Sequence, residues 1–250
     1  MTNALSEIDN AIKLDSSNLD LHIWKAKILE RTKNFDQAIE ILEKVADKKF
    51  KLDSVYFYIG FVYFVKAIHY SLEKNNKQAS YEYYKKAITY YDKAIDKNPQ
   101  FFDAYTEKIR TLHNLGKYSE ALAVINSALV LFPEDIRLIY LRGKERICLG
   151  DFTGAMADLN TAIESKKLDS EYLAKAYRFR GLAKFEKNNF DEAIEDFTTS
   201  LKYDNSYLTL YNRANAYIRL GERDKACEDY RKAAEMGFSD AYEKIRQYCD

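Results

Sequence analysis

The histidines, cysteines and carboxylates of this 250-residue chain show no spacing typical of a catalytic or metal centre. His22, His69 and His113 are far apart in the sequence, which has neither an HExxH motif nor a CxxC pair. Glycine-rich phosphate loops and the GxSxG nucleophile motif are also absent from the sequence. We therefore expect a protein that is not an enzyme, with no catalytic residues, no metal and no cofactor.

Arginine and aspartate recur at a fixed distance in the second half of the sequence. Three pairs are each separated by 16 positions: Arg142 and Asp158, Arg180 and Asp196, Arg213 and Asp229. Each arginine precedes a small residue, and each aspartate precedes a large core residue. A guanidinium group matches a carboxylate with two parallel hydrogen bonds. The spacing thus predicts three structural ion pairs in preference to a ladder of ligand contacts.

Small residues follow a second regular spacing, which indicates paired helices. Gly143 and Ala155, like Gly181 and Ala193, are 12 positions apart. A small side chain at such a position lets two helices approach closely while a larger side chain of the partner fills the gap. Gly116 and its counterparts downstream are expected to end first helices in the left-handed conformation. One helical hairpin cannot bury its own apolar face, so the pattern favours stacked copies.

These positions resemble the tetratricopeptide repeat. The hallmark residues are Tyr105, Ala121, Ile125, Ala128 and Pro133 in one copy and Gly143, Arg146, Ala155, Leu159 and Ala162 in the next. The resemblance covers essentially the whole chain and implies an all-α fold, a right-handed α-solenoid of about six stacked helix-turn-helix repeats. In that family, first helices line the concave face, which grips a peptide or partner protein. The ending YRKAAEMGFSDAYEKIRQYC is similar to the C-terminal cap of many bacterial members.

We expect residues 1–250 to form one superhelical domain. It would contain an orphan or capping helix at 3–15, repeats starting near 19, 53, 102, 136, 174 and 207, and a capping helix at 239–249. The second repeat is oversized, because Gly60 and Ala87 are 27 positions apart where other repeats have 12. We therefore expect both of its helices to be longer by about seven residues, roughly two turns. The resulting hairpin, from 53 to about 97, would protrude beyond its neighbours.

Charge and apolar runs limit the other classes of function. Lys+Arg and Asp+Glu both number 39, so the chain has no overall preference for nucleic acid or an anionic membrane. The apolar run VYFYIGFVYFV at 55–65 is shorter than the roughly 20 residues of a spanning helix. The N-terminus lacks the pattern of a signal peptide. Three scattered cysteines make a disulfide framework unexpected and favour a cytoplasmic location.

The family's pattern assigns a set of mostly cationic residues, interleaved with tyrosine, to the concave face. They are Arg110, His113, Arg137, Tyr140, Lys144, Lys175, Arg178, Tyr211 and Asn215. We interpret them as a groove for an acidic segment or a C-terminal carboxylate. A solvated face without a ligand remains the alternative. Of the five positions that form a chaperone-binding clamp in part of the family, only Lys144 is basic here, so that role is not expected.

The aromatic residues of the long hairpin allow two interpretations. Tyr81, Tyr84 and Tyr91, with Phe57, Phe61 and Phe64, fall at helical spacing. They form either a core stripe or, where the hairpin outruns its neighbours, an exposed patch for a partner or for self-association. The favoured function is a non-catalytic scaffold or adaptor that binds a peptide or partner protein. A regulatory or accessory subunit of an enzyme complex and RNA binding along the basic groove are the alternatives.

Overall fold

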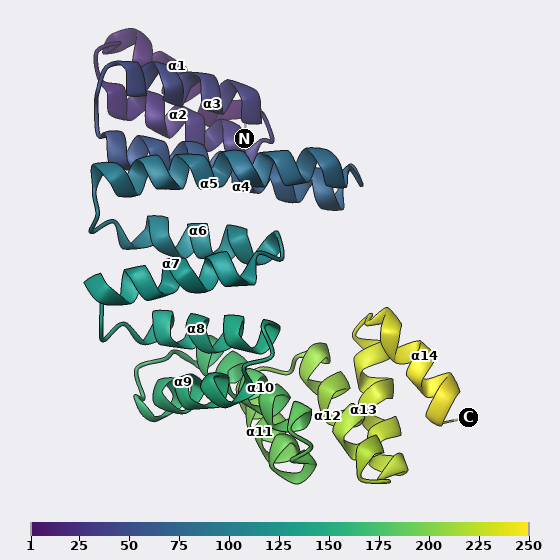
Figure 1. The fold of residues 1–250 in the computed structure, drawn as a ribbon. Coiled ribbons are helices and arrows are strands. Elements are labelled where there is room, and N and C mark those ends of the chain that lie inside the picture. Colours follow the sequence, from purple (N-terminus) through teal and green to yellow (C-terminus); the bar gives the residue numbers. More distant parts are fainter. Residues whose placement is uncertain (1, 250) are drawn as a thin grey trace. The chain divides into compact units, whose positions relative to one another are not determined.

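The computed structural model of the chain describes residues 2–249, with side chains from residue 4 onward. Within that range every regular element is an α-helix, from α1 to α14, and no strand is present (Figure 1). The expected all-α fold is therefore confirmed. Contacts group the helices into two compact units, residues 1–124 and 125–250, and the boundary lies inside α7 (Tyr118–Leu131). One continuous domain over the whole chain stays a prediction.

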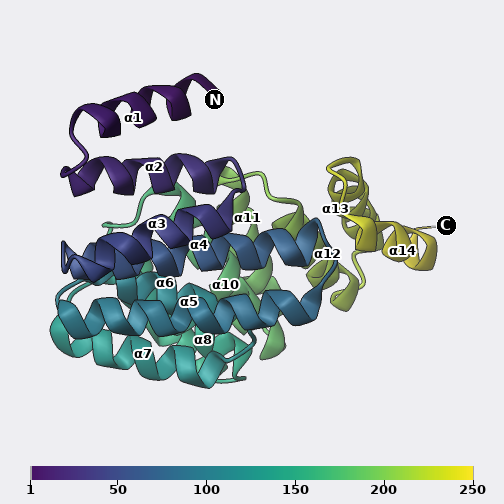
Figure 2. The same ribbon diagram turned by 90° about the horizontal axis from the view of Figure 1, so that it is seen from above.

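The first unit is a series of helices in which each packs on the next (Figure 2). Its complete helices are α1 (Thr2–Leu14), α2 (Leu19–Arg31), α3 (Phe35–Asp47), α4 (Leu52–Leu72), α5 (Lys77–Lys97) and α6 (Phe102–Asn114). Apolar residues at helical spacing build its core, among them Ala26, Leu42 and Ile59, which are almost fully buried. The helix α1 packs on α2, at the position expected for the orphan helix.

The hairpin formed by α4 and α5 is longer than the hairpin before it. Each of its helices has 21 residues, whereas α2 and α3 have 13 each, and it extends past α3 and α6 (Figure 1). At its centre, a Cβ added to Gly60 would lie 2.8 Å from the Tyr91 ring, so only glycine allows this approach. Phe64, Tyr84 and Tyr91 are buried, while Tyr81 is 41% exposed. The aromatic stripe is therefore mostly core, with an uncovered part near the tip.

The helix α4 is long and apolar enough to cross a membrane when only its length and composition are considered. The helix has 21 residues, and further apolar residues follow Lys66, which ends the run at 55–65. In the structure, Val55, Ile59 and Val62 are buried in the core of the first unit. The Lys66 ammonium, also buried, forms a 2.5 Å ion pair with Asp36 of α3. Packing inside the unit thus accounts for the apolar character of α4.

The second unit repeats the helical hairpin three times and ends with one further helix. After the last part of α7 come α8 (Ile136–Cys148), α9 (Phe152–Glu164), α10 (Ser170–Glu186), α11 (Phe190–Tyr203), α12 (Tyr207–Arg219), α13 (Arg223–Glu235) and α14 (Ser239–Tyr248). The helix α10 begins four residues before the start expected near 174. The Asp169 side chain caps it by accepting a hydrogen bond from the Tyr172 N–H, which stabilises the additional turn.

The left-handed turn after a first helix is made by glycine in some repeats and by other residues elsewhere. Gly116, Gly150 and Gly221 have φ of 71°, 78° and 78°, as expected from the sequence. Lys33 and Asn188 adopt the same conformation, with φ of 62° and 63°. The left-handed conformation is less favourable for a residue with a Cβ than for glycine, so the turns at Lys33 and Asn188 lower the stability of their repeats.

The expectation that the cysteines form no disulfide is wrong. Cys227 of α13 and Cys249, which follows α14, are bonded to each other, and their Cα atoms are 5.7 Å apart. The two residues are 22 positions apart in the sequence. They meet because the chain reverses direction between α13 and α14, a long-range contact that cysteine spacing does not reveal. Cys148 is a free, exposed thiol.

Candidate functional site

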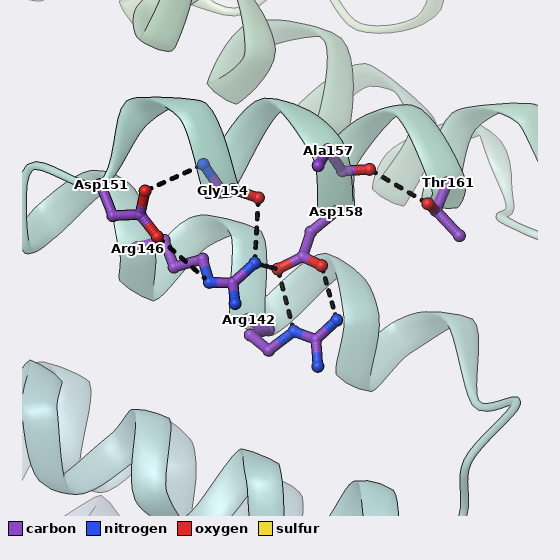
Figure 3. A network of polar contacts seen from close by, with 7 residues as sticks. All are labelled: Arg142, Arg146, Asp151, Gly154, Ala157, Asp158 and Thr161. Carbon is purple, nitrogen blue, oxygen red and sulfur yellow. Dashed lines mark hydrogen bonds and ion pairs between the residues drawn. The ribbon is translucent and has the colours of Figure 1, made fainter.

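The three arginine–aspartate pairs form as the sequence predicts. In the first pair, the Arg142 Nε and Nη2 atoms donate to the two oxygens of Asp158 at 2.9 and 2.6 Å (Figure 3). Arg146 adds a 2.7 Å hydrogen bond to Asp158 and a 3.1 Å bond to the Gly154 carbonyl. Asp158 is only 4% exposed, so its charge is neutralised inside the hairpin.

The other two pairs also connect neighbouring repeats. Arg180 binds Asp196 at 2.8 and 2.6 Å, and its Nη1 atom reaches Asn160 Oδ1 of the preceding repeat at 2.7 Å. Arg213 binds Asp229 at 2.7 and 2.9 Å and donates to Thr198 Oγ1 of the preceding repeat at 3.0 Å. The hydrogen bond to the partner aspartate is the largest effect raising the pKa of Arg180. These guanidinium groups have structural partners and are not the cations that a ligand would find.

A different pair of cations lies on the first helices of the second unit. We call Lys144 of α8 and Arg178 of α10, with the aromatic residues around them, the cationic face. Tyr140 is buried there, and its ring centroid lies 5.3 Å from that of Tyr172 and 6.1 Å from that of Phe179. The Arg178 guanidinium stacks 4.4 Å above the Phe179 ring. The cationic face therefore consists of charges set among aromatic rings.

Burial disfavours the charged forms of both cations. It lowers the pKa of Lys144, and the positive charge of Arg178 acts in the same direction, while Glu145, 3.7 Å away, opposes the shift. Burial also lowers the pKa of Arg178, against the opposing effects of Tyr140 and Asp204. Among the residues that the structure describes, Arg178 forms no ion pair and donates no hydrogen bond. An anion bound here would offset the cost of placing both charges away from water.

Four other predicted site residues of the second unit have partners in the fold. Lys175 forms an ion pair with Glu171 of its own helix, and Arg137 lies 3.4 Å from the Asp135 carboxylate. Asn215 accepts a 2.6 Å hydrogen bond from the Tyr230 hydroxyl. Tyr211 packs against Tyr230 and Phe238, with ring centroids 5.6 and 5.1 Å away. Tyr211 and Asn215 therefore hold α12 against the helices that follow it.

Two predicted site residues belong to the first unit, on α6. Arg110 is exposed, hydrogen-bonded to Glu107 one turn earlier and stacked 4.1 Å from the Phe64 ring centroid. His113 is partly buried, and its ring centroid is 5.4 Å from that of Tyr118. Burial raises the pKa of Glu107, and the nearby Arg110 opposes this effect. The structure thus places both residues in local contacts of the first unit.

One feature of the first unit was not predicted from the sequence. A pocket lies between α2 and α4, lined by Trp24, Lys27, Tyr58 and Phe61 among others. The signal that could have indicated it is the chain's single tryptophan, which lies one helical turn from a lysine on a predicted first helix.

The comparison with known families decides what these repeated hairpins are. Tetratricopeptide repeat families match residues 19–47, 82–145, 174–207 and 207–236, together more than half of the chain. The chain belongs to the tetratricopeptide repeat family. The Arg180–Asp196 and Arg213–Asp229 pairs lie inside the matched segments, as do Lys144 and Arg178 of the cationic face.

Curated relatives and solved structures agree with this assignment. A TPR repeat-containing protein of Methanocaldococcus jannaschii is 28% identical over 164 residues, which are 65% of this chain and 28% of that protein. The Hsp70-Hsp90 organizing protein of Triticum aestivum is 43% identical over 60 residues, 23% of this chain and 10% of that protein. The chain thus spans less than a third of the length of either relative. A tetratricopeptide repeat protein structure from Parabacteroides merdae has a TM-score of 0.69 at 15% identity, covering 100% of this chain and 92% of that one, and supports the α-solenoid fold.

Proposed function

We propose that this protein is a non-catalytic interaction module whose cationic face binds an acidic segment of a partner protein. Tetratricopeptide repeat proteins bind protein or peptide partners, which supports the general class. The observation that carries the specific proposal is Arg178, a partly buried guanidinium without an ion pair among the described residues. Lys144 provides a second, partly buried cation on the neighbouring first helix.

The geometry favours a ligand whose carboxylate binds Arg178 in a fixed orientation over one that is held only by long-range attraction between charges. Stacking on Phe179 restricts the orientation of the Arg178 guanidinium, so less conformational entropy is lost when a carboxylate binds its two donors. The aromatic surroundings exclude water and strengthen the interaction. Asp191, Glu192 and Glu195 of α11 are exposed and acidic, so positive and negative charges are segregated within the second unit although the whole chain is neutral.

The relation to the Hsp70-Hsp90 organizing protein does not by itself identify chaperones as partners. The positions that would form a chaperone-binding clamp here are Tyr140, Lys144, Phe179, Leu208 and Asn212. Only Lys144 among them is basic, and Arg178 lies one position before Phe179. We therefore propose an acidic ligand that is held by a different arrangement of cations.

Peptide titration by calorimetry tests the proposal. The probes are a peptide ending in several aspartate and glutamate residues, its C-terminal amide, and a version with all acids replaced by the corresponding amides. Arg178→Gln and Lys144→Gln should each weaken binding of the acidic peptide by about tenfold, the effect of removing a charged hydrogen bond worth roughly 1.5 kcal/mol. Lys202→Gln, which removes an exposed charge on α11, is the matched control.

Two outcomes would reject the acidic-ligand proposal. One is equal affinity for the acidic peptide and the amide version. The other is binding that survives combined replacement of Arg137, Lys144, Lys175 and Arg178 by glutamate. Preferential, strongly salt-dependent binding of single-stranded RNA would favour the nucleic-acid alternative instead. A role as an accessory subunit of an enzyme would require a catalytic partner to be recovered with the protein.

A second candidate surface is the tip of the long hairpin. Leu72 is 79% exposed and Tyr81 is 41% exposed beside a pocket of about 490 Å³. We propose that this tip is where the chain would contact a second copy or another protein. Sedimentation of the wild type and of Leu72→Glu at high concentration tests self-association. If the tip mediates it, the wild type should form dimers and the variant should remain a monomer.

A cytoplasmic location also stays a proposal. The Cys227–Cys249 bond weighs against it, because disulfides are rare in reducing compartments. Cell fractionation that recovers the protein outside the cytoplasm would reject it.

A further inference from the structure

The first unit contains a pocket of about 560 Å³ that opens between α2 and α4. Its volume falls in the range of ligand sites, roughly 300–1,000 Å³. Ala26, Leu42 and Val62 are buried at its base, with at most 3% of their surface exposed. Trp24, by contrast, is 57% exposed at the edge. A large indole beside an open apolar hollow is an arrangement typical of binding surfaces.

Three charged residues line the pocket: the cationic Lys27 and Arg31 and the acidic Glu30. The Lys27 ammonium lies 4.1 Å from the Tyr58 ring centroid and 4.6 Å from that of Trp24. Neither Lys27 nor Arg31 forms an ion pair with any residue in the described part of the chain. Glu30 is half-buried, and burial raises its pKa while Arg31 opposes that shift. The edge of the pocket therefore has one excess positive charge.

We propose that this pocket, the Trp24 pocket, binds a partner segment that carries a large apolar side chain beside a carboxylate. The apolar side chain packs against Trp24, Tyr58 and Phe61 and displaces water from the hollow. The carboxylate meets Lys27, whose ammonium is held over two rings without an acidic partner. Lysine has a long flexible side chain, so it reaches the ligand while its stem still covers the rings.

The arrangement disfavours a cationic ligand. The space between the Trp24 and Tyr58 rings already holds the Lys27 ammonium. A second cation would have to displace it and would meet the positive charge of Arg31. Glu30 alone does not reverse this balance, because the two cations outnumber it. The ligand class is therefore an apolar–acidic segment.

The single tryptophan allows a direct test in the full chain, because Trp24 fluorescence reports on this pocket alone. The probes are acetylated and amidated glycine–serine octapeptides with a central Phe-Glu, Phe-Gln, Phe-Lys or Ala-Glu pair. The Phe-Glu peptide should cause a saturable shift of Trp24 emission. Replacing its Glu by Gln should weaken binding about two- to fivefold, as expected for a partly exposed ion pair. Replacing Phe by Ala should weaken it at least about tenfold.

Variants of two lysines on the same helix assign the effect to the pocket. Lys27→Gln should reduce the affinity for the Phe-Glu peptide to that for Phe-Gln. Lys25→Gln should leave both affinities unchanged, because Lys25 pairs with Asp9 at 2.7 Å and does not line the pocket. Circular dichroism of each variant checks that the fold is retained.

The proposal is overturned by any of three results: no saturable change of Trp24 emission up to about millimolar peptide, tighter binding of Phe-Lys than of Phe-Glu, or a gain in affinity from Lys27→Gln. Arg178→Gln serves as a further control, since it should not alter this titration. Failure of the Trp24 pocket and failure of the cationic face in the second unit are therefore distinguishable.

Discussion

The disulfide between Cys227 and Cys249 should contribute measurably to the stability of the second unit. Reducing the bond, or replacing Cys249 by serine, is the perturbation. The bond attaches the end of α14 to α13, and α14 otherwise buries Ala241 and parts of Ile245 and Tyr248. A helix with so small an apolar contact depends on additional attachment to remain docked.

The size of the effect follows from the length of chain that the bond closes. For cysteines 22 positions apart, the loss of loop-closure entropy in the unfolded state corresponds to about 3 kcal/mol at 25 °C. Reduction should loosen α14, whose own apolar contacts are small, and leave the hairpins before it packed, so the folded state should change little in the rest of the core. We therefore expect the free energy of unfolding of the second unit to fall by about 3 kcal/mol.

Three measurements check this expectation. Thiol titration in denaturant without reductant should detect one thiol, that of Cys148, and three after reduction. Urea unfolding followed by circular dichroism should show the loss of stability on reduction, and Cys249→Ser should reproduce it without reductant. Hydrogen exchange should accelerate first in α14. Three reactive thiols in protein purified without reductant, or a change below about 0.5 kcal/mol on reduction, would contradict the reasoning.

Further predictions concern single charges, each measured by chemical or thermal unfolding. Arg213→Leu should lower the free energy of unfolding by about 3–5 kcal/mol, because Asp229 is 2% exposed and forms no other ion pair among the described residues. Arg142→Leu should lower it less, since Arg146 still neutralises Asp158. Lys33→Gly should raise the free energy of unfolding by less than about 1 kcal/mol, because relief of the left-handed backbone is partly offset by loss of the exposed Lys33–Glu73 ion pair. The stability of the wild type should rise as pH increases from the lowered pKa of Lys144 towards 10.5, because burial lowers that pKa and the unfolded chain holds the proton more tightly. Lys144→Met should flatten this part of the pH profile.

Features set by short periodic spacing could be predicted from the sequence. Gly181 illustrates this, because a Cβ there would lie 2.7 Å from the Phe197 ring, so the small residue is required where the helices touch. The arginine–aspartate pairs follow for the same reason, since position within one repeat fixes both partners. The helix starts near 19, 102, 136 and 207 coincide with those in the structure.

Features that depend on nonlocal packing could not be predicted in this way. The disulfide needs α14 to fold back beside α13, which the cysteine spacing does not specify. Tyr211 has a position typical of a binding residue, yet its ring packs between Tyr230 and Phe238. The pairing of Lys175 with Glu171 was visible in principle, because residues four positions apart share one helical face. The Trp24 pocket depends on the distance between α2 and α4, which the periodicity of the sequence does not specify.

The status of each cation follows from whether its own repeat supplies an anion. Arg142, Arg180 and Arg213 have an aspartate in the facing helix, so the fold itself satisfies their charge. Lys27 and Arg178 stack on aromatic rings and form no ion pair in the described part of the chain. Burying such a charge costs stability unless a ligand offsets it. A cation without an anion in its own unit is the one expected to bind an anionic group of a partner, which is why the two proposed sites are located at these two residues.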